Sequence, residues 1–131
     1  MTIVRQRSGG DCAIAVLATL AGVSYEAAGN AAAKIERARK GTAGLYNREV
    51  VAIAKQLGVA LQPTRDYDLE LDAGVLRVRW EEATEHRGGH FVALSAGLIL
   101  CPREGVARPW REYLAVHRAR TCTLLRTANA C

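Results

Sequence analysis

The sequence predicts an α+β fold, with helices in the N-terminal half and an antiparallel sheet in the C-terminal half. Apolar residues recur at helical spacing as far as Leu57. Beyond Gly58 the apolar residues form short runs or alternate with polar ones, which is typical of strands. Because helices and strands are segregated along the chain, we expect α+β rather than alternating α/β architecture.

The size of the chain fits one domain. It has 131 residues, of which 50% are hydrophobic, enough to fill one core. We therefore predict a single domain over residues 1–131, in which residues 127–131 form a frayed tail.

Local signals mark the ends of the predicted helices. Asp11 suits the positive end of the first helix, and Gly22 ends it. Ser24 is expected to cap the second helix, and Asn47 the third, which stops at Gly58. The predicted helices are Asp11–Ala21, Tyr25–Arg39 and Arg48–Leu57.

Turn residues separate the predicted strands. Ser95 to Gly97 reads as the turn of a hairpin. Pro109 is expected to open a short helix, because its fixed φ angle suits a first turn. The predicted strands are Val59–Thr64, Val75–Trp80, His90–Ala96, Leu98–Cys101 and Thr121–Arg126, and the short helix is Trp110–His117.

The charge of the protein favours no particular partner. The formal net charge is +5 and the isoelectric point is about 9.3, but the basic residues are spread along the chain. Aromatic residues make up only 5% of the chain, too few for the usual stacking platform of a nucleic-acid binder. A basic module that binds an acidic partner remains an alternative.

The cysteine pattern gives no sign of a metal or another cofactor. None of the four cysteines forms a Cys-x-x-Cys pair, so we predict neither a zinc site nor a redox dithiol. With no secretory signal and no apolar run of about 18 residues, we predict no membrane span and a cytoplasmic location. Cys122 is expected to pack within a strand, and His86 and His117 are expected at the surface.

Cys12 is a candidate nucleophile because it stands where a glycine-bearing loop enters an apolar helix. The unpaired N–H groups of a helix N-terminus stabilise a thiolate, which predicts a lowered thiol pKa. Gln6, six residues earlier, has an amide that can reach an oxyanion forming beside that sulfur. The alternative is that Cys12 is an inert, buried, small hydrophobic residue.

His90 is the candidate general base. It opens a predicted strand directly after Gly88 and Gly89, so its imidazole is expected at an accessible and fixed position. A histidine distant in sequence and near in space is what a nucleophilic cysteine requires. The alternative is a histidine with a purely structural role at a strand end.

Together these motifs resemble the papain clan of cysteine peptidases. Gln6 and Cys12 open a helix, and Gly89-His90-Phe91-Val92 follows on a strand. Closer still, Asp11-Cys12, followed by Ala15, Leu17-Ala18 and Gly22, is similar to the bacteriocin-processing Gly-Gly leader peptidases of certain ABC exporters and their stand-alone relatives. The resemblance implies a papain-like fold in which Cys12 is the nucleophile and His90 the base. It also implies that Gln6 completes the oxyanion hole with the backbone N–H of Cys12.

The sequence departs from that family at the third catalytic position. The family places an Asp, or an Asn in papain-like relatives, before a proline on the strand after the histidine. This chain has Cys101 before Pro102, and a neutral thiol is a weak hydrogen-bond partner. Glu104 is the alternative orienting group. Cys101 near the site also offers a disulfide with Cys12 on oxidation.

These residues predict a thiol hydrolase that cleaves a peptide or isopeptide bond through a thioester intermediate. The resemblance implies a peptide or protein substrate with small residues before the cut. Two alternatives remain: a papain-like domain that binds a peptide or protein without cutting it, and another acyl transfer, transamidation or deamidation, on the same thiol. The sequence leaves the substrate and the oligomeric state open.

Overall fold

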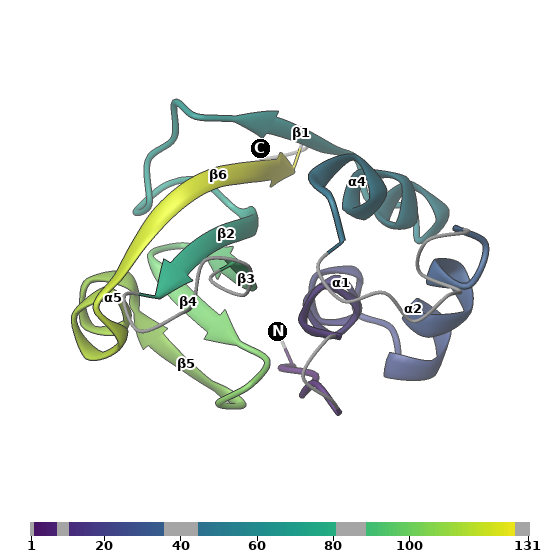
Figure 1. Cartoon of the computed structure of the whole chain (residues 1–131), viewed down its shortest axis with the longest axis horizontal. Helices are drawn as coiled ribbons and strands as arrows, with labels where there is room; N and C mark the ends of the chain where they lie inside the picture. The colour runs from purple at the N-terminus through teal and green to yellow at the C-terminus, as the bar shows by residue number, and fades with distance from the viewer. Residues whose placement is uncertain (1, 8–10, 36–44, 81–88, 128–131) are drawn as a thin grey trace.

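The computed structural model describes residues 2–7, 11–35, 45–80 and 89–127 and confirms the predicted α+β layout. Helices lie in the N-terminal part of the chain and the sheet in the C-terminal part (Figure 1). The helices are α1 Cys12–Ala21, α2 Tyr25–Ala32, α4 Asn47–Gln56 and α5 Trp110–His117. The strands are β1 Leu61–Thr64, β2 Gly74–Trp80, β3 Gly89–Ser95, β4 Leu98–Cys101, β5 Val106–Pro109 and β6 Ala119–Thr127.

The strands form one antiparallel sheet in the order β1-β6-β2-β3-β4-β5. Pro63 lies in β1, at the edge of the sheet, where a missing N–H does not interrupt a ladder. The predicted hairpin joins β3 to β4, with Ala93 paired to Leu100. This register carries Cys101 to the part of the sheet that holds His90.

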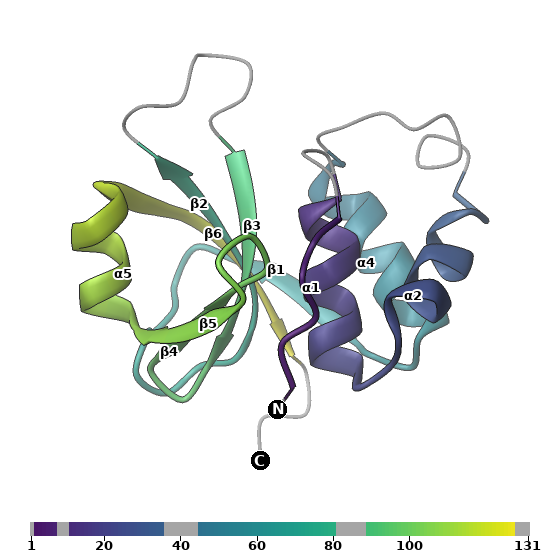
Figure 2. The ribbon, with the colours of Figure 1, turned by 90° about the horizontal axis from the view of Figure 1, so that it is seen from below.

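The sheet has an apolar cluster on each face. Helices α1 and α4 lie against one face with α2 packed on them, and α5 lies on the other face (Figure 2). Because successive strand residues point to opposite faces, Phe91 and Ala93 pack toward the N-terminal helices, whereas Val92 and Leu94 pack toward α5. The sheet is therefore the common wall of two cores.

The helix ends differ from the prediction in two places. Helix α2 ends at Ala32, because Lys34 and Ile35 make tighter i→i−3 bonds to Ala31 and Ala32; predicted helical residues 36–39 lie outside the described residues. Helix α4 is capped by Tyr46 rather than Asn47. The carboxylate of Glu49 accepts a 2.7 Å bond from the Tyr46 backbone N–H. Gly22 and Ser24 end and cap their helices as predicted.

The C-terminal part of the sheet has one more strand than predicted, and its last strand is longer than predicted. Strand β5 was not expected, because its four residues have no strong pattern and are ordered by pairing with β4. Strand β6 reaches Thr127, whose backbone N–H donates to the carbonyl of Ala73 at 2.9 Å. The expected frayed tail was therefore wrong at Thr127, and residues 128–131 lie outside the described residues.

In the part of the chain that the structure describes, no single helix is long and apolar enough to cross a membrane. Helices α1 and α2 meet the length and composition requirement only when they are joined, and the chain bends by 117° between them.

Candidate active site

Cys12 is the first residue of α1 and is half-buried against β3. The backbone N–H of Phe91 lies near its sulfur and acts to lower the pKa of the thiol. The preceding segment is held by Asp11, whose carboxylate accepts hydrogen bonds from the Arg7 backbone N–H at 2.8 Å and the Tyr25 hydroxyl at 2.6 Å. The contact with Phe91 places the thiol beside the residue that follows His90.

The pKa of Cys12 is shifted in the direction opposite to the sequence expectation. Burial raises it, because a thiolate at this position loses hydration. Hydrogen bonds from backbone N–H groups, including that of Phe91, lower the pKa, but by less, and the carboxylate of Asp11 raises it further. Loss of water therefore outweighs the field of the helix N-terminus.

His90 lies on β3, and its imidazole is directed to the α5 side of the sheet. Its Nε2 atom is 3.5 Å from Sγ of Cys101, and its ring centroid is 5.0 Å from that of Trp80. Burial lowers the pKa of His90 to about 4, and electrostatic repulsion from Arg103 and His117 acts in the same direction. The ring is therefore neutral at pH 7.

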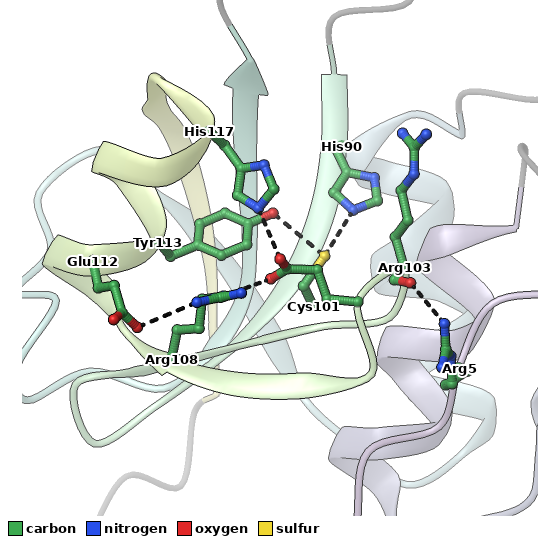
Figure 3. A network of polar contacts seen from close by, with 9 residues as sticks. Arg5, His90, Cys101, Arg103, Arg108, Glu112, Tyr113 and His117 are labelled. Atoms are coloured by element: carbon green, nitrogen blue, oxygen red, sulfur yellow. Dashed lines mark hydrogen bonds and ion pairs between the residues drawn. The ribbon is translucent and has the colours of Figure 1, made fainter.

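Cys12 on α1 and His90 on β3 lie near each other in space but on opposite faces of the sheet. Cys12 contacts the backbone of Phe91, whose side chain faces α1, whereas the imidazole of His90 lies with Cys101 on the opposite face. Among the described residues, no hydrogen bond joins Cys12 to His90. Figure 3 shows that Nδ1, the other ring nitrogen of His90, points away from Cys101.

The N-terminal segment crosses to the turn that follows β4. The backbone N–H of Gln6 donates to the carbonyl of Pro102 at 3.0 Å, and the guanidinium of Arg5 donates to the carbonyl of Arg103 at 3.2 Å. The side-chain Oε1 of Gln6 is buried. Gln6 is thereby fixed beside the third catalytic position predicted from the sequence.

Cys101 occupies that third position and is completely buried. Its sulfur lies between Nε2 of His90 and the hydroxyl of Tyr113, which donates to it at 3.4 Å (Figure 3). Glu104 instead lies 3.1 Å from Nε of Arg108 and 3.3 Å from Nε2 of His117. The structure therefore brings Cys101, and not Glu104, to the imidazole of His90.

Sequence reasoning missed the part that α5 contributes. Tyr113 and His117 lie one turn apart on this helix, with ring centroids 4.5 Å apart, and His117 stacks on Trp80 at 4.6 Å. His117 was expected at the surface but is only partly exposed, with 18% of its side chain accessible, and His86, expected there too, lies outside the described residues. The i, i+4 spacing of two aromatic rings was the available signal.

Cys122 also differs from expectation. It is exposed rather than packed, because Thr121 and Thr123 pair with the adjacent residues Val78 and Arg77, leaving Cys122 as the extra residue of a bulge. Within the described ranges, no group of three metal-ligating side chains is close enough to hold an ion. The reactive groups near β3 are the thiols of Cys12 and Cys101, the imidazoles of His90 and His117, and the phenol of Tyr113.

No protein-family model and no curated protein matches this sequence.

Proposed function

We propose that this protein is a papain-like thiol hydrolase in which Cys12 attacks a peptide or isopeptide carbonyl and His90 transfers the proton. The supporting observation is the position of Cys12 in the fold. It begins α1 with its sulfur against the backbone N–H of Phe91, the residue next to His90. A nucleophile at a helix start and a base on the adjoining strand are the two groups that acyl transfer needs.

The proposed reaction has two halves. His90 takes the thiol proton of Cys12 as the sulfur bonds to the carbonyl carbon, and the side-chain amide of Gln6 and the backbone N–H of Cys12 stabilise the oxyanion. The imidazolium then gives its proton to the leaving amine as the C–N bond breaks, which leaves a thioester. Water attacks the thioester, His90 takes the water proton and returns it to the sulfur, and the product acid leaves.

The pKa shifts bear on the timing of the first proton transfer. Burial raises the pKa of Cys12 and lowers that of His90 to about 4, so both groups are neutral before the reaction. The proton therefore moves during attack rather than beforehand. Catalytic hydrogen bonds often tighten only when the substrate is bound, and this mechanism requires the His90 ring to come within reach of Cys12 in that complex.

The substrate class follows from the resemblance to Gly-Gly leader peptidases: an extended peptide or protein segment with small residues before the cut. A thiol nucleophile works in a reducing compartment, so a cytoplasmic location belongs to the same proposal.

A second candidate is a papain-like domain that binds such a segment without cutting it. The observation that favours it is Cys101, which stands in place of the acid and meets the imidazole of His90 at 3.5 Å. In the serine-protease template, losing the orienting acid is costly.

Cleavage of a synthetic Gly-Gly-containing peptide in H₂¹⁸O, followed by mass spectrometry, tests the proposal. The native chain is expected to release an acid carrying one ¹⁸O atom, and Cys12→Ala is expected to release none. Cys122→Ala, at an exposed cysteine, is the matched control and is expected to retain full activity. In a second experiment hydroxylamine is added as an acceptor. A hydroxamate product without hydrolysis then indicates acyl transfer to amines. Binding with neither product supports the second candidate.

A further inference from the structure

A buried hydrogen-bond chain runs from α5 through β4 to β3. The hydroxyl of Tyr113 donates to Sγ of Cys101 at 3.4 Å, and the same sulfur lies 3.5 Å from Nε2 of His90 (Figure 3). Tyr113 and Cys101 are fully buried, so the protons of this chain are shared among its members rather than with bulk water. The direction of each hydrogen bond then depends on which protons the Tyr113 hydroxyl, the Cys101 thiol and the His90 imidazole can donate.

Tyr113 enters the chain as a donor. Burial and the neighbouring sulfur raise the pKa of its hydroxyl, so the phenol stays protonated. A neutral thiol has one S–H donor, and its sulfur can also accept. Because the sulfur of Cys101 already accepts from Tyr113, its own proton is available to Nε2 of His90. An imidazole nitrogen accepts a hydrogen bond better than a thiol sulfur does, which favours S–H···N over N–H···S.

We propose that Tyr113 and Cys101 are positioning residues that set the tautomer of His90, with the Cys101 thiol donating to Nε2 and the single imidazole proton held on Nδ1. In this arrangement the hydrogen bonds all run in one direction, O–H to S–H to N. Each bond polarises the next and strengthens it.

The other groups around His90 keep its imidazole neutral, so that the ring varies in tautomer and not in charge. Trp80 from β2 and His117 from α5 flank the imidazole region, and Arg103 lies in the turn after β4. Arg103 and His117 both disfavour a second proton on the ring, and burial acts in the same direction. A neutral imidazole carries one proton, and the neighbours of its two nitrogens decide where that proton resides.

For catalysis the inference rests on the proposed function. Nδ1 is the ring nitrogen directed away from Cys101, and it must be unprotonated to accept the proton of Cys12. Only the minor tautomer, with the proton on Nε2, is then competent, so turnover falls in proportion to its population. A carboxylate at position 101 accepts from Nε2–H and reverses the preference.

Long-range ¹H–¹⁵N correlation spectra of the ¹⁵N-labelled chain at pH 7 test the inference, with the resonances of His90 assigned from a His90→Gln variant. The native protein is expected to show a protonated Nδ1 and an unprotonated Nε2. Cys101→Asp is expected to show the reverse, and Cys101→Ala to lose the Nδ1 preference. Cys122→Ala, at the exposed bulge on β6, is expected to keep the native pattern.

A native spectrum dominated by Nε2–H overturns the inference, and so does a spectrum of Cys101→Ala identical to the native one. If Cys101→Asp does not fold, the spectra of the native protein and of Cys101→Ala still test the inference. The spectra are also recorded in Cys12→Ala, which has no nucleophile, so the tautomer result does not depend on turnover. If the proposed function also holds, Cys101→Asp raises turnover by about tenfold or more, as expected for moving the ring into its competent tautomer.

Discussion

At the scale of single residues, burial has a larger effect than charge on the two candidate catalytic groups. Cys12 is at a helix N-terminus, yet loss of hydration raises its pKa. His90 contacts a thiol rather than a carboxylate, and burial lowers its pKa to about 4. Both shifts favour the uncharged forms, so the resting site differs from the thiolate–imidazolium pair that a charged partner would stabilise.

The lowered pKa of His90 predicts acid sensitivity. An unfolded histidine has a pKa of about 6.5. Between pH 6.5 and 4 the unfolded chain therefore binds a proton that native His90 does not, so stability is lost as the pH falls. The loss at His90 amounts to about 2–3 kcal/mol between pH 7 and 4.5. Urea unfolding of the native chain and of His90→Gln at these two pH values measures it. Equal losses in both proteins would contradict the assignment.

Sequence reasoning singled out Cys12 and His90 from local signals, a helix start and a glycine pair before a strand, and Cys101 from its place before Pro102 in the family pattern. The direction of the Cys12 pKa shift was not predictable, because it depends on what covers the helix end. Tyr113 was missed for a similar reason, since its contact with Cys101 joins elements that only the fold brings together.

At the scale of elements, those with strong local signals were placed best. Helix α1 ends at Gly22 in a left-handed conformation, as a C-terminal glycine predicts. Strand β5 was missed because it depends on pairing with β4, and the end of α2 was misplaced because its last turn tightens. Neither the pairing with β4 nor the tightening of the last turn of α2 can be predicted from the pattern of apolar residues.

Gly74 is the position where the sheet least tolerates a side chain. Its φ angle is +150°, and a Cβ there would stand 2.0 Å from the backbone oxygen of Leu125 on β6. Gly74→Ala is expected to lower the free energy of unfolding by about 2–4 kcal/mol, because the neighbouring backbone must shift.

Gly29 is the matched control for Gly74. It lies within α2 with open space around its missing Cβ, so Gly29→Ala is expected to stabilise by up to about 1 kcal/mol. Urea denaturation of both variants tests the pair. Similar stabilities of the two would contradict the β2–β6 packing described above.

At the scale of the whole molecule, the candidate site lies where the helical layer meets the sheet. The N-terminal segment connects the two: Val4 donates to the Thr19 hydroxyl on α1 at 2.9 Å, and Gln6 donates to Pro102 after β4 at 3.0 Å. One face of the sheet supports α1 with Cys12, and the other holds the chain formed by Tyr113, Cys101 and His90. The candidate nucleophile therefore lies beside one core and the candidate base beside the other.

The most direct test of the account is acylation of Cys12 by Gly-Gly p-nitrophenyl ester, located by peptide mapping and mass spectrometry. The leaving group needs no protonation, so the rate reports attack by the thiol alone. We expect an acyl group on Cys12 in the native chain, and a rate at least ~100-fold lower in His90→Gln, as general-base catalysis implies. Exposed Cys122 provides the internal reference, with the same slow background in both proteins. An unmodified Cys12, or equal rates in the two proteins, would contradict the catalytic pair and favour a binding domain.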